Sequence, residues 1–338
     1  MKKYTIPYAE LKELCQQKLE KNGLNREDAE TVAKCYATAD LYGVSSHGVA
    51  ILPSHINRIQ RGGYNLAPKI QVEKSSSSFA VINSDNAMGP ISASFCTQKA
   101  ISLATTEGIG VVFTHHANTY GPAFIYALAM AEKGLIGITC CNSPSAMPAP
   151  NGKEKLLGTN PLAIVIPSKS GTSIIYDIAT SIVAKSKINQ IRIAGGTIPA
   201  GWALDRNGIP TTDPAAAIEG LVLPMAGFKG YGLAMMIDIL AGVLSGAFYL
   251  NRVNRFYSDN SACMNVGQFY MAIDPVIVLG TNFYEIMRDY ISTIRTSEKI
   301  DQTKPIALPG DDRIQNFQHN RSNGIEISEE LYEFLTNN

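Results

Sequence analysis

Residues 79–113, FAVINSDNAMGPISASFCTQKAISLATTEGIGVVF, decide the fold class of this chain. The stretch begins with a short apolar run at 79–82 and ends with a second one at 109–113, and such runs predict buried strands. The residues between them, at 92–106, follow a helical pattern. A strand, a helix and a second strand in this order predict an α/β fold.

The same mixture of patterns continues along the rest of the chain. Near its two ends, Asn25 and Ser328 offer side chains that suit the start of a helix. We expect a mainly helical unit built from residues 1–74 and 281–338, which flanks an α/β unit with a central sheet at 75–280. Further strands are expected at 135–139, 162–166 and 173–176, further helices at 10–21, 122–132, 230–247 and 283–295, and a mixed pattern fills 248–282.

The composition excludes several classes of protein. A chain of 338 residues, 45% of them hydrophobic, is long enough for roughly two domains with well-filled cores. Lys+Arg and Asp+Glu number 29 each, so the charge pattern predicts no binding to nucleic acid or to an anionic membrane. The N-terminus lacks the apolar segment of a signal peptide, which predicts a cytoplasmic protein.

Neither a membrane span nor a metal centre is indicated. The most apolar segment, 233–250, is interrupted by Asp238 and so resembles a buried helix more than a membrane span. The six cysteines form no C-x-x-C pair and have no histidine at zinc spacing. They therefore predict reduced, structural thiols rather than disulfides or a zinc site.

His47 is the first candidate for chemistry among the five histidines. Gly43 and Gly48 bracket a short polar loop, and catalytic groups often lie on such loops. An imidazole titrates near pH ~6.5, which suits it to proton transfer at a carbonyl oxygen. A capping or packing role is the alternative, and the residue type alone leaves both open.

Two further candidates lie where predicted strands end. His116 follows the run 109–113, and its neighbour His115 would point to the opposite face of an extended segment. Asp177 follows the run 173–176, where a carboxylate could orient an imidazole. Structural roles remain the alternative for both residues.

No standard dinucleotide-binding loop is found. Nowhere does G-x-G-x-x-G follow a strand and open a helix, so a Rossmann fold is not supported. The best phosphate-binding candidate is the turn at 227–232, where glycines permit close backbone approach and Lys229 supplies charge. Packing at a helix start is the alternative. Weaker candidate turns lie at 150–152, 158–161 and 179–181.

In combination these motifs are more specific than each is alone. Their order is SSHGV at 45–49, GTNPL at 158–162, DIATS at 177–181, GWALD at 201–205, PTTDP at 210–214 and KGYGL at 229–233. From residue 8 to residue 313 the chain resembles the malate/L-lactate dehydrogenase family of NAD(P)-dependent oxidoreductases. That family also includes ureidoglycolate dehydrogenase, sulfolactate dehydrogenase, diketogulonate reductase and a cyclic-imine reductase.

The resemblance implies reduction of a 2-oxo acid, or the reverse oxidation, by a homodimer with a cofactor fold that is not Rossmann. NAD is the expected cofactor, NADP the alternative, and no metal is implied. It implies that residues 75–280 bind the nicotinamide cofactor and that the helical unit serves the substrate and the dimer. His47 corresponds to the proton donor, and Ser46 and Asp177 to the groups that position it. The implied cofactor contacts are Thr159, Asn160, Ala179, Thr180, Ser181, Lys229, Pro309, Gly310 and Asp311.

Two departures from the family pattern affect the substrate site. Ile51 stands where many members carry an arginine that binds the substrate carboxylate, so a bidentate guanidinium is missing. Thr119 stands where the family often has a histidine, before the pair Tyr120-Gly121. The expected substrate contacts are therefore Ile51, Thr119, Tyr120 and His116, with Arg58 and His55 as further replacements for the missing group.

These departures leave alternative functions open. The substrate could be a neutral ketone or a cyclic imine instead of a 2-oxo acid. The chain could also be a catalytically silent sensor that binds a nucleotide or metabolite, although His47 and Asp177 favour an enzyme. A hydrolase with Ser46 as nucleophile is disfavoured, because adjacent side chains rarely align and no G-x-S-x-G elbow is present.

Overall fold

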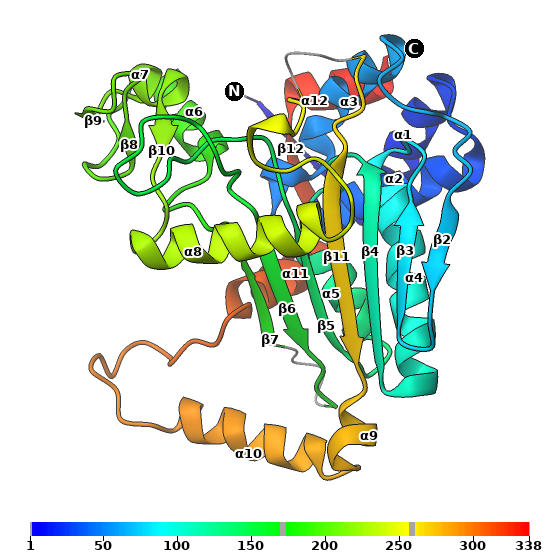
Figure 1. The fold of residues 1–338 in the computed structure, drawn as a ribbon. Coiled ribbons are helices and arrows are strands. Elements are labelled where there is room, and N and C mark those ends of the chain that lie inside the picture. Colours follow the sequence, from blue (N-terminus) through cyan, green and yellow to red (C-terminus); the bar gives the residue numbers. More distant parts are fainter. Residues whose placement is uncertain (1, 170–173, 257–260, 338) are drawn as a thin grey trace.

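The computed structural model describes residues 2–169, 174–256 and 261–337. A seven-stranded sheet in the order β2-β3-β4-β11-β5-β6-β7 forms its centre (Figure 1). Among the described pairs of this sheet, β3 and β4 alone are parallel, which is unlike the parallel sheet of a Rossmann fold. The strands are β2 (Gln71–Ser75), β3 (Phe79–Asn83), β4 (Ile109–Ala117), β5 (Ile136–Cys141), β6 (Leu162–Ile166), β7 (Ile174–Ile178) and β11 (Val266–Ile273).

The strand–helix–strand order predicted for residues 79–113 is present as β3, α4 (Gly89–Glu107) and β4. The expected strands at 135–139 and 162–166 are confirmed as β5 and β6. The strand expected at 173–176 is confirmed as β7 from residue 174 onward, whereas Ser173 lies outside the described residues. The chain is therefore a mixed α/β protein, as predicted.

Helices cover both faces of the sheet (Figure 1). On one face α4 and α5 (Phe124–Ala131) pack against the main core, which includes Tyr270 of the central strand. On the other face lie α8 (Phe228–Ile237) and a π-helical turn (Asp238–Val243), which contact Phe269. Strand β11 is thus buried on both sides, although residues 248–282 showed no clear strand pattern.

The two ends of the chain lie side by side. Strand β1 (Lys3–Ile6) pairs antiparallel with β12 (Ile325–Ser328). As predicted, Asn25 caps α2 by accepting from Asp28 N, and Ser328 caps α12 by accepting from Leu331 N. The boundaries at residues 74 and 281 stay a prediction. The helices here are α1 (Tyr8–Lys21), α2 (Arg26–Leu41), α3 (Leu52–Gln60), α11 (Asp311–Asn323) and α12 (Glu329–Thr336).

A small subdomain with its own apolar core follows β7. Its three-stranded sheet has the order β10-β8-β9. Ile188, Ala203 and Val222 are buried together in its centre. The elements are α6 (Lys185–Ile193), β8 (Ala203–Leu204), β9 (Pro210–Thr211), α7 (Pro214–Glu219) and β10 (Leu221–Val222).

The remaining elements include a helical arm that extends from one end of the sheet (Figure 1). It consists of α9 (Pro275–Leu279) and α10 (Phe283–Arg295). Three 3₁₀ turns lie at Ser45–His47, Val49–Ile51 and Leu250–Arg252. In the described ranges, no helix has both the length and the apolar character that crossing a membrane requires.

Candidate active site

His47 lies on the 3₁₀ turn that follows α2. Its Nδ1 is 3.0 Å from the Ser46 hydroxyl oxygen, so these two predicted residues are in contact. In the described part of the chain the other ring nitrogen, Nε2, has no hydrogen-bond partner. Nε2 is therefore the nitrogen that is left to exchange a proton with a ligand.

A buried carboxylate holds the loop of His47 in place by accepting a hydrogen bond from the backbone. Asp40 of α2 is 6% exposed, and its Oδ2 accepts a hydrogen bond of 2.7 Å from Val49 N. A Cβ atom at Gly48 would overlap this carboxylate, so the loop passes too close for any larger residue. Burial raises the pKa of Asp40 to about 7, although the hydrogen bond from the backbone of Val49 opposes this rise.

The sequence analysis missed Asp40, although a signal was present. Asp40 follows Tyr36 by one helical turn and Ala33 by two, and both of these residues are fully buried. A carboxylate on the apolar face of a helix needs a specific partner in the folded protein.

Asp177, at the end of β7, forms an ion pair with a residue that was not predicted. Its Oδ2 is 2.9 Å from Nη2 of Arg313, and the two side chains are 12% and 17% exposed. Burial raises the pKa of Asp177, while the charge of Arg313 opposes that rise. No hydrogen bond joins Asp177 to His47 within the described ranges, so the expected positioning role stays a prediction.

The positive charge of Arg313 acts on both Asp177 and His47. Although part of His47 remains exposed, the surrounding protein lowers the pKa of its imidazole, and the guanidinium lowers it further. His47 is consequently neutral at pH 7 in the free protein.

A cavity of about 360 Å³ lies where the His47 loop, α6 and α11 meet. Ser46 and Arg313 both line it, so the hydroxyl and the guanidinium face one space. Such a volume suits a small ligand or one end of a larger one. Other lining residues are Tyr42, Lys187, Gln190, Asp312 and Asn316.

Thr159, Asn160 and Thr180 lie close together at the start of β6. Thr180 N donates to Thr159 O at 3.0 Å, and the Asn160 amide donates to Ala234 O of α8 at 2.9 Å. Asn160 therefore connects the start of β6 to α8. The Thr180 hydroxyl is buried and has no hydrogen-bond partner among the described residues, which is unusual and leaves it free for a ligand. Ala179 is half-buried beside it, and the Ser181 hydroxyl donates to Val183 O.

The turn at Pro309, Gly310 and Asp311 leads into α11 and packs against β7. Pro309 O accepts from Ile175 N at 3.0 Å. Gly310 has φ of +94°, a conformation that favours glycine, and it packs against Ile175. Arg295 donates to both carboxylate oxygens of Asp311 and lowers the pKa of Asp311. This turn fixes where α11 begins and therefore where Arg313, in the first turn of that helix, lies.

Lys229 and Tyr120 do not line the cavity. Lys229 is exposed in the first turn of α8 and has no partner in the described chain. Tyr120 is buried and stacks on Tyr126. Thr119 is half-buried, and Ile51 is half-buried against the main core.

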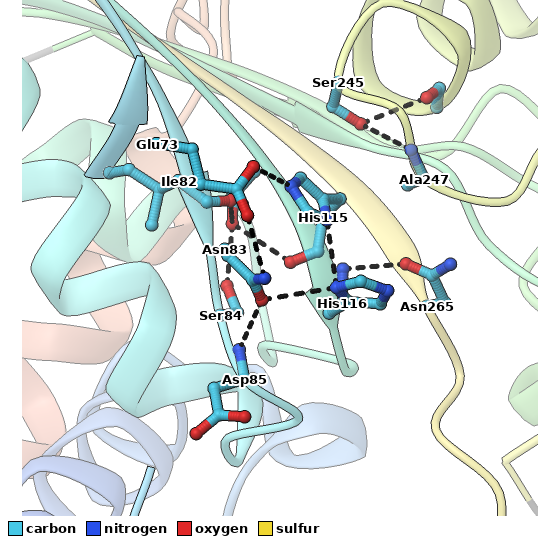
Figure 2. Close-up of polar contacts among 12 residues, drawn as sticks. Glu73, Ile82, Asn83, Ser84, Asp85, His115, His116, Ser245, Ala247 and Asn265 are labelled. Atoms are coloured by element: carbon cyan, nitrogen blue, oxygen red, sulfur yellow. Dashed lines mark hydrogen bonds and ion pairs between the residues drawn. The ribbon is translucent and has the colours of Figure 1, made fainter. Parts of the chain in front are cut away.

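His116 belongs to a separate polar cluster at the ends of β2, β3 and β4 (Figure 2). Its Nδ1 is 3.0 Å from Nδ1 of His115 and 3.2 Å from Oδ1 of Asn83. His115 in turn is 3.0 Å from the carboxylate of Glu73. None of these residues lines the cavity beside His47.

The other two replacements for the missing arginine are also engaged elsewhere. His55 is fully buried between the hydroxyls of Tyr36 and Tyr64, and burial lowers its pKa to about 3. Arg58 is fully buried and donates to the backbone carbonyls of Phe256 and Ala262. Neither residue lines the cavity.

Known proteins match this chain over nearly its whole length. A family model described as malate/L-lactate dehydrogenase matches residues 6–336. Ureidoglycolate dehydrogenase (NAD(+)) of Escherichia coli (strain K12) is 35% identical, covering 96% of this chain and 93% of that protein. Malate dehydrogenase of Pyrococcus horikoshii is 37% identical, with 94% and 89% covered.

The fold matches as closely as the sequence. The solved structure of sulfolactate dehydrogenase from Methanocaldococcus jannaschii has a TM-score of 0.90 and 35% identity, covering 98% of this chain and 95% of that chain. The predicted enzyme class, an NAD(P)-dependent dehydrogenase, is confirmed by these relatives. The chain belongs to the malate/L-lactate dehydrogenase family, as its motifs indicated.

Proposed function

We propose that the protein interconverts a 2-hydroxy acid and a 2-oxo acid, with NAD as cofactor and His47 as the proton donor and acceptor. The observation that carries this proposal is the contact of His47 with Ser46, which lines a cavity together with a guanidinium. A titrating imidazole beside a fixed cation suits a substrate with a carbonyl next to a carboxylate. The names of the relatives agree, since malate, sulfolactate and ureidoglycolate are all hydroxy acids.

The described residues fit a nicotinamide dinucleotide. The buried Thr180 hydroxyl lacks a partner and could donate to a ligand, and Lys229 is free to bind a phosphate. A Cβ atom at Gly227 or Gly232 would meet open space, so the start of α8 is accessible. When bound, the nicotinamide supplies the hydride to the substrate carbon or accepts it.

His47 transfers the proton that accompanies this hydride. The Ser46 hydroxyl contacts Nδ1, so Nε2 is the nitrogen that exchanges the proton with the carbonyl oxygen. In the oxidation the neutral imidazole accepts the alcohol proton, and in the reduction the protonated imidazole returns it. Its lowered pKa favours the neutral form in the free protein, ready to act as a base.

Asp177 acts on His47 indirectly, through Arg313. Its carboxylate, 2.9 Å from the guanidinium, offsets much of that positive charge. Without this compensation Arg313 would depress the pKa of His47 further and would make the protonated donor harder to form.

We further propose that the active protein is a homodimer. Large apolar side chains are exposed along α8 and the π-helical turn, including Phe228 at 76%, Val243 at 51% and Leu244 at 57%. The arm helix α10 exposes Ile286 at 52% and Tyr290 at 57%. A second copy would cover such surfaces, which are otherwise costly in water. Light scattering should therefore give twice the mass of one chain, and a monomer would contradict this proposal.

The experiment that tests the function measures nicotinamide absorbance with NADH and with NADPH. A panel of 2-oxo acids, the corresponding amides, neutral ketones and cyclic imines should give turnover with the 2-oxo acids, and a His47→Ala variant should not. Turnover of the neutral compounds or imines alone would contradict the proposed substrate. Cofactor binding without any turnover would indicate a sensor instead.

A further inference from the structure

We infer that Arg313 binds the carboxylate of the substrate, in place of the arginine that the chain lacks at position 51. This inference rests on the proposed function and names the residue that selects an anionic substrate. Neither the motifs nor their spacing pointed to Arg313, because its partner Asp177 lies 136 residues away in the sequence.

The fold fixes Arg313 at one wall of the cavity. The Gly310 turn starts α11 directly beside β7, which brings the first turn of this helix to Asp177. The guanidinium carbon also lies 4.6 Å from the ring centroid of Phe124. An ion pair through Nη2 and an aromatic ring together hold the group in place before any ligand arrives.

One end of this guanidinium is left without a partner. Nη1 of Arg313 is buried and makes no hydrogen bond to any of the residues that the structure describes. A buried, charged donor in this state is rare and needs an acceptor. A carboxylate is the natural acceptor for Nη1, because a hydrogen bond between a guanidinium and a carboxylate is charge-assisted and therefore stronger than one to a neutral group.

The position relative to His47 also fits a 2-oxo acid. In a 2-oxo acid the carboxylate is bonded to the carbon of the reacting carbonyl. The protein group that binds the carboxylate must therefore lie next to the group that gives a proton to the carbonyl oxygen. Arg313 lines the same cavity as Ser46, whose hydroxyl contacts His47, and its charge lowers the pKa of His47. A bound carboxylate would neutralise this charge and help His47 to take up the proton that the reduction consumes.

Other cations near the site fit this role less well. Lys187 lines the same cavity but is exposed, so water screens and competes for its charge. Arg58 donates to backbone carbonyls and lies outside the cavity lining. Ile51 packs against the main core and brings no charge.

The test compares Arg313→Gln and Arg313→Lys with Arg321→Gln, a control on the exposed end of the same helix. KM and kcat are measured for a 2-oxo acid and for its neutral amide, together with NADH affinity. Arg313→Gln should raise KM for the acid by about 10- to 100-fold, since a charge-assisted hydrogen bond is lost. The amide and NADH should respond less than about threefold. Lysine should restore only part of the loss.

Binding of oxalate, measured by calorimetry in the presence of NADH, separates this inference from the proposed function. Oxalate that binds the wild type but not Arg313→Gln supports the inference even if no 2-oxo acid is turned over. Equal losses for acid and amide, loss of NADH binding, or unchanged oxalate affinity in Arg313→Gln would overturn it. A wild type that does not bind oxalate would overturn it as well.

Discussion

Replacing Asp177 by asparagine is expected to destabilise the protein, because the Arg313 guanidinium would then be buried without a countercharge. The two side chains are 12% and 17% exposed, and the paired atoms are 2.9 Å apart. Two unit charges about 4 Å apart attract by ~4 kcal/mol at an effective dielectric constant of ~20. Much of this attraction offsets the cost of removing both ions from water. We therefore expect a net loss of about 1–3 kcal/mol in the free energy of unfolding.

Thermal unfolding of four proteins measures this effect: the wild type, Asp177→Asn, Arg313→Gln and the double variant. Asp177→Asn should lower Tm by about 2–6 °C. The double variant should lose less than the sum of the two single losses, because it contains no uncompensated charge. An unchanged Tm in Asp177→Asn, or strictly additive losses in the double variant, would refute the reasoning.

Further predictions concern the loop of His47. Gly48→Ala should lower kcat/KM and the free energy of unfolding, because the added Cβ overlaps the Asp40 carboxylate. The loss in the free energy of unfolding should be about 1–3 kcal/mol. Activity assays and thermal unfolding measure the two effects. Since the pKa of Asp40 is raised to about 7 from 3.8, its contribution to stability is present below pH 3.8 and is lost as the pH rises to about 7. The free energy of unfolding, obtained from thermal unfolding between pH 4 and pH 8, should therefore fall more in the wild type than in Asp40→Asn, and the difference should be at most about 4 kcal/mol. Because the pKa of His47 is lowered, the half-maximal point of kcat/KM for the oxidation should lie below pH 6.5, and pH profiles should show this limb at higher pH in Arg313→Gln.

Regular patterns made much of the fold predictable. The run at 162–166 coincides with β6, and the pattern at 283–295 coincides with α10. In both segments the spacing of the apolar residues and the residues that end the element predict the same boundaries. The prediction that the sheet is not a Rossmann sheet came from a missing glycine motif, and the antiparallel strand pairs agree with it.

The central strand β11 could not be predicted in the same way. Its sequence VGQFYMAI shows neither clean alternation nor a continuous apolar run, because Gly267 and the buried Gln268 interrupt it. Gln268 is satisfied by donating to Asn118 O, a partner 150 residues away. The expected helix at 230–247 was too long, since regular α-helix ends at Ile237 and a π-helical turn follows.

The candidate site was predictable only where its parts are local or recognisable as a motif. His47 and Ser46 are neighbours in the chain, and their contact is local. Asp177 was identified, but its partner Arg313 comes from a distant helix. His116 and Arg58 were plausible by spacing alone, yet tertiary contacts engage both outside the cavity.

The most direct test of proton transfer by His47 is a single-turnover measurement of NADH oxidation by a 2-oxo acid. The proteins compared are the wild type, His47→Ala and His319→Ala, whose changed residue is exposed on α11. His47→Ala should bind NADH normally but react about 10²- to 10⁴-fold more slowly, whereas His319→Ala should match the wild type. A His47→Ala variant that oxidises NADH at the wild-type rate would contradict the central claim.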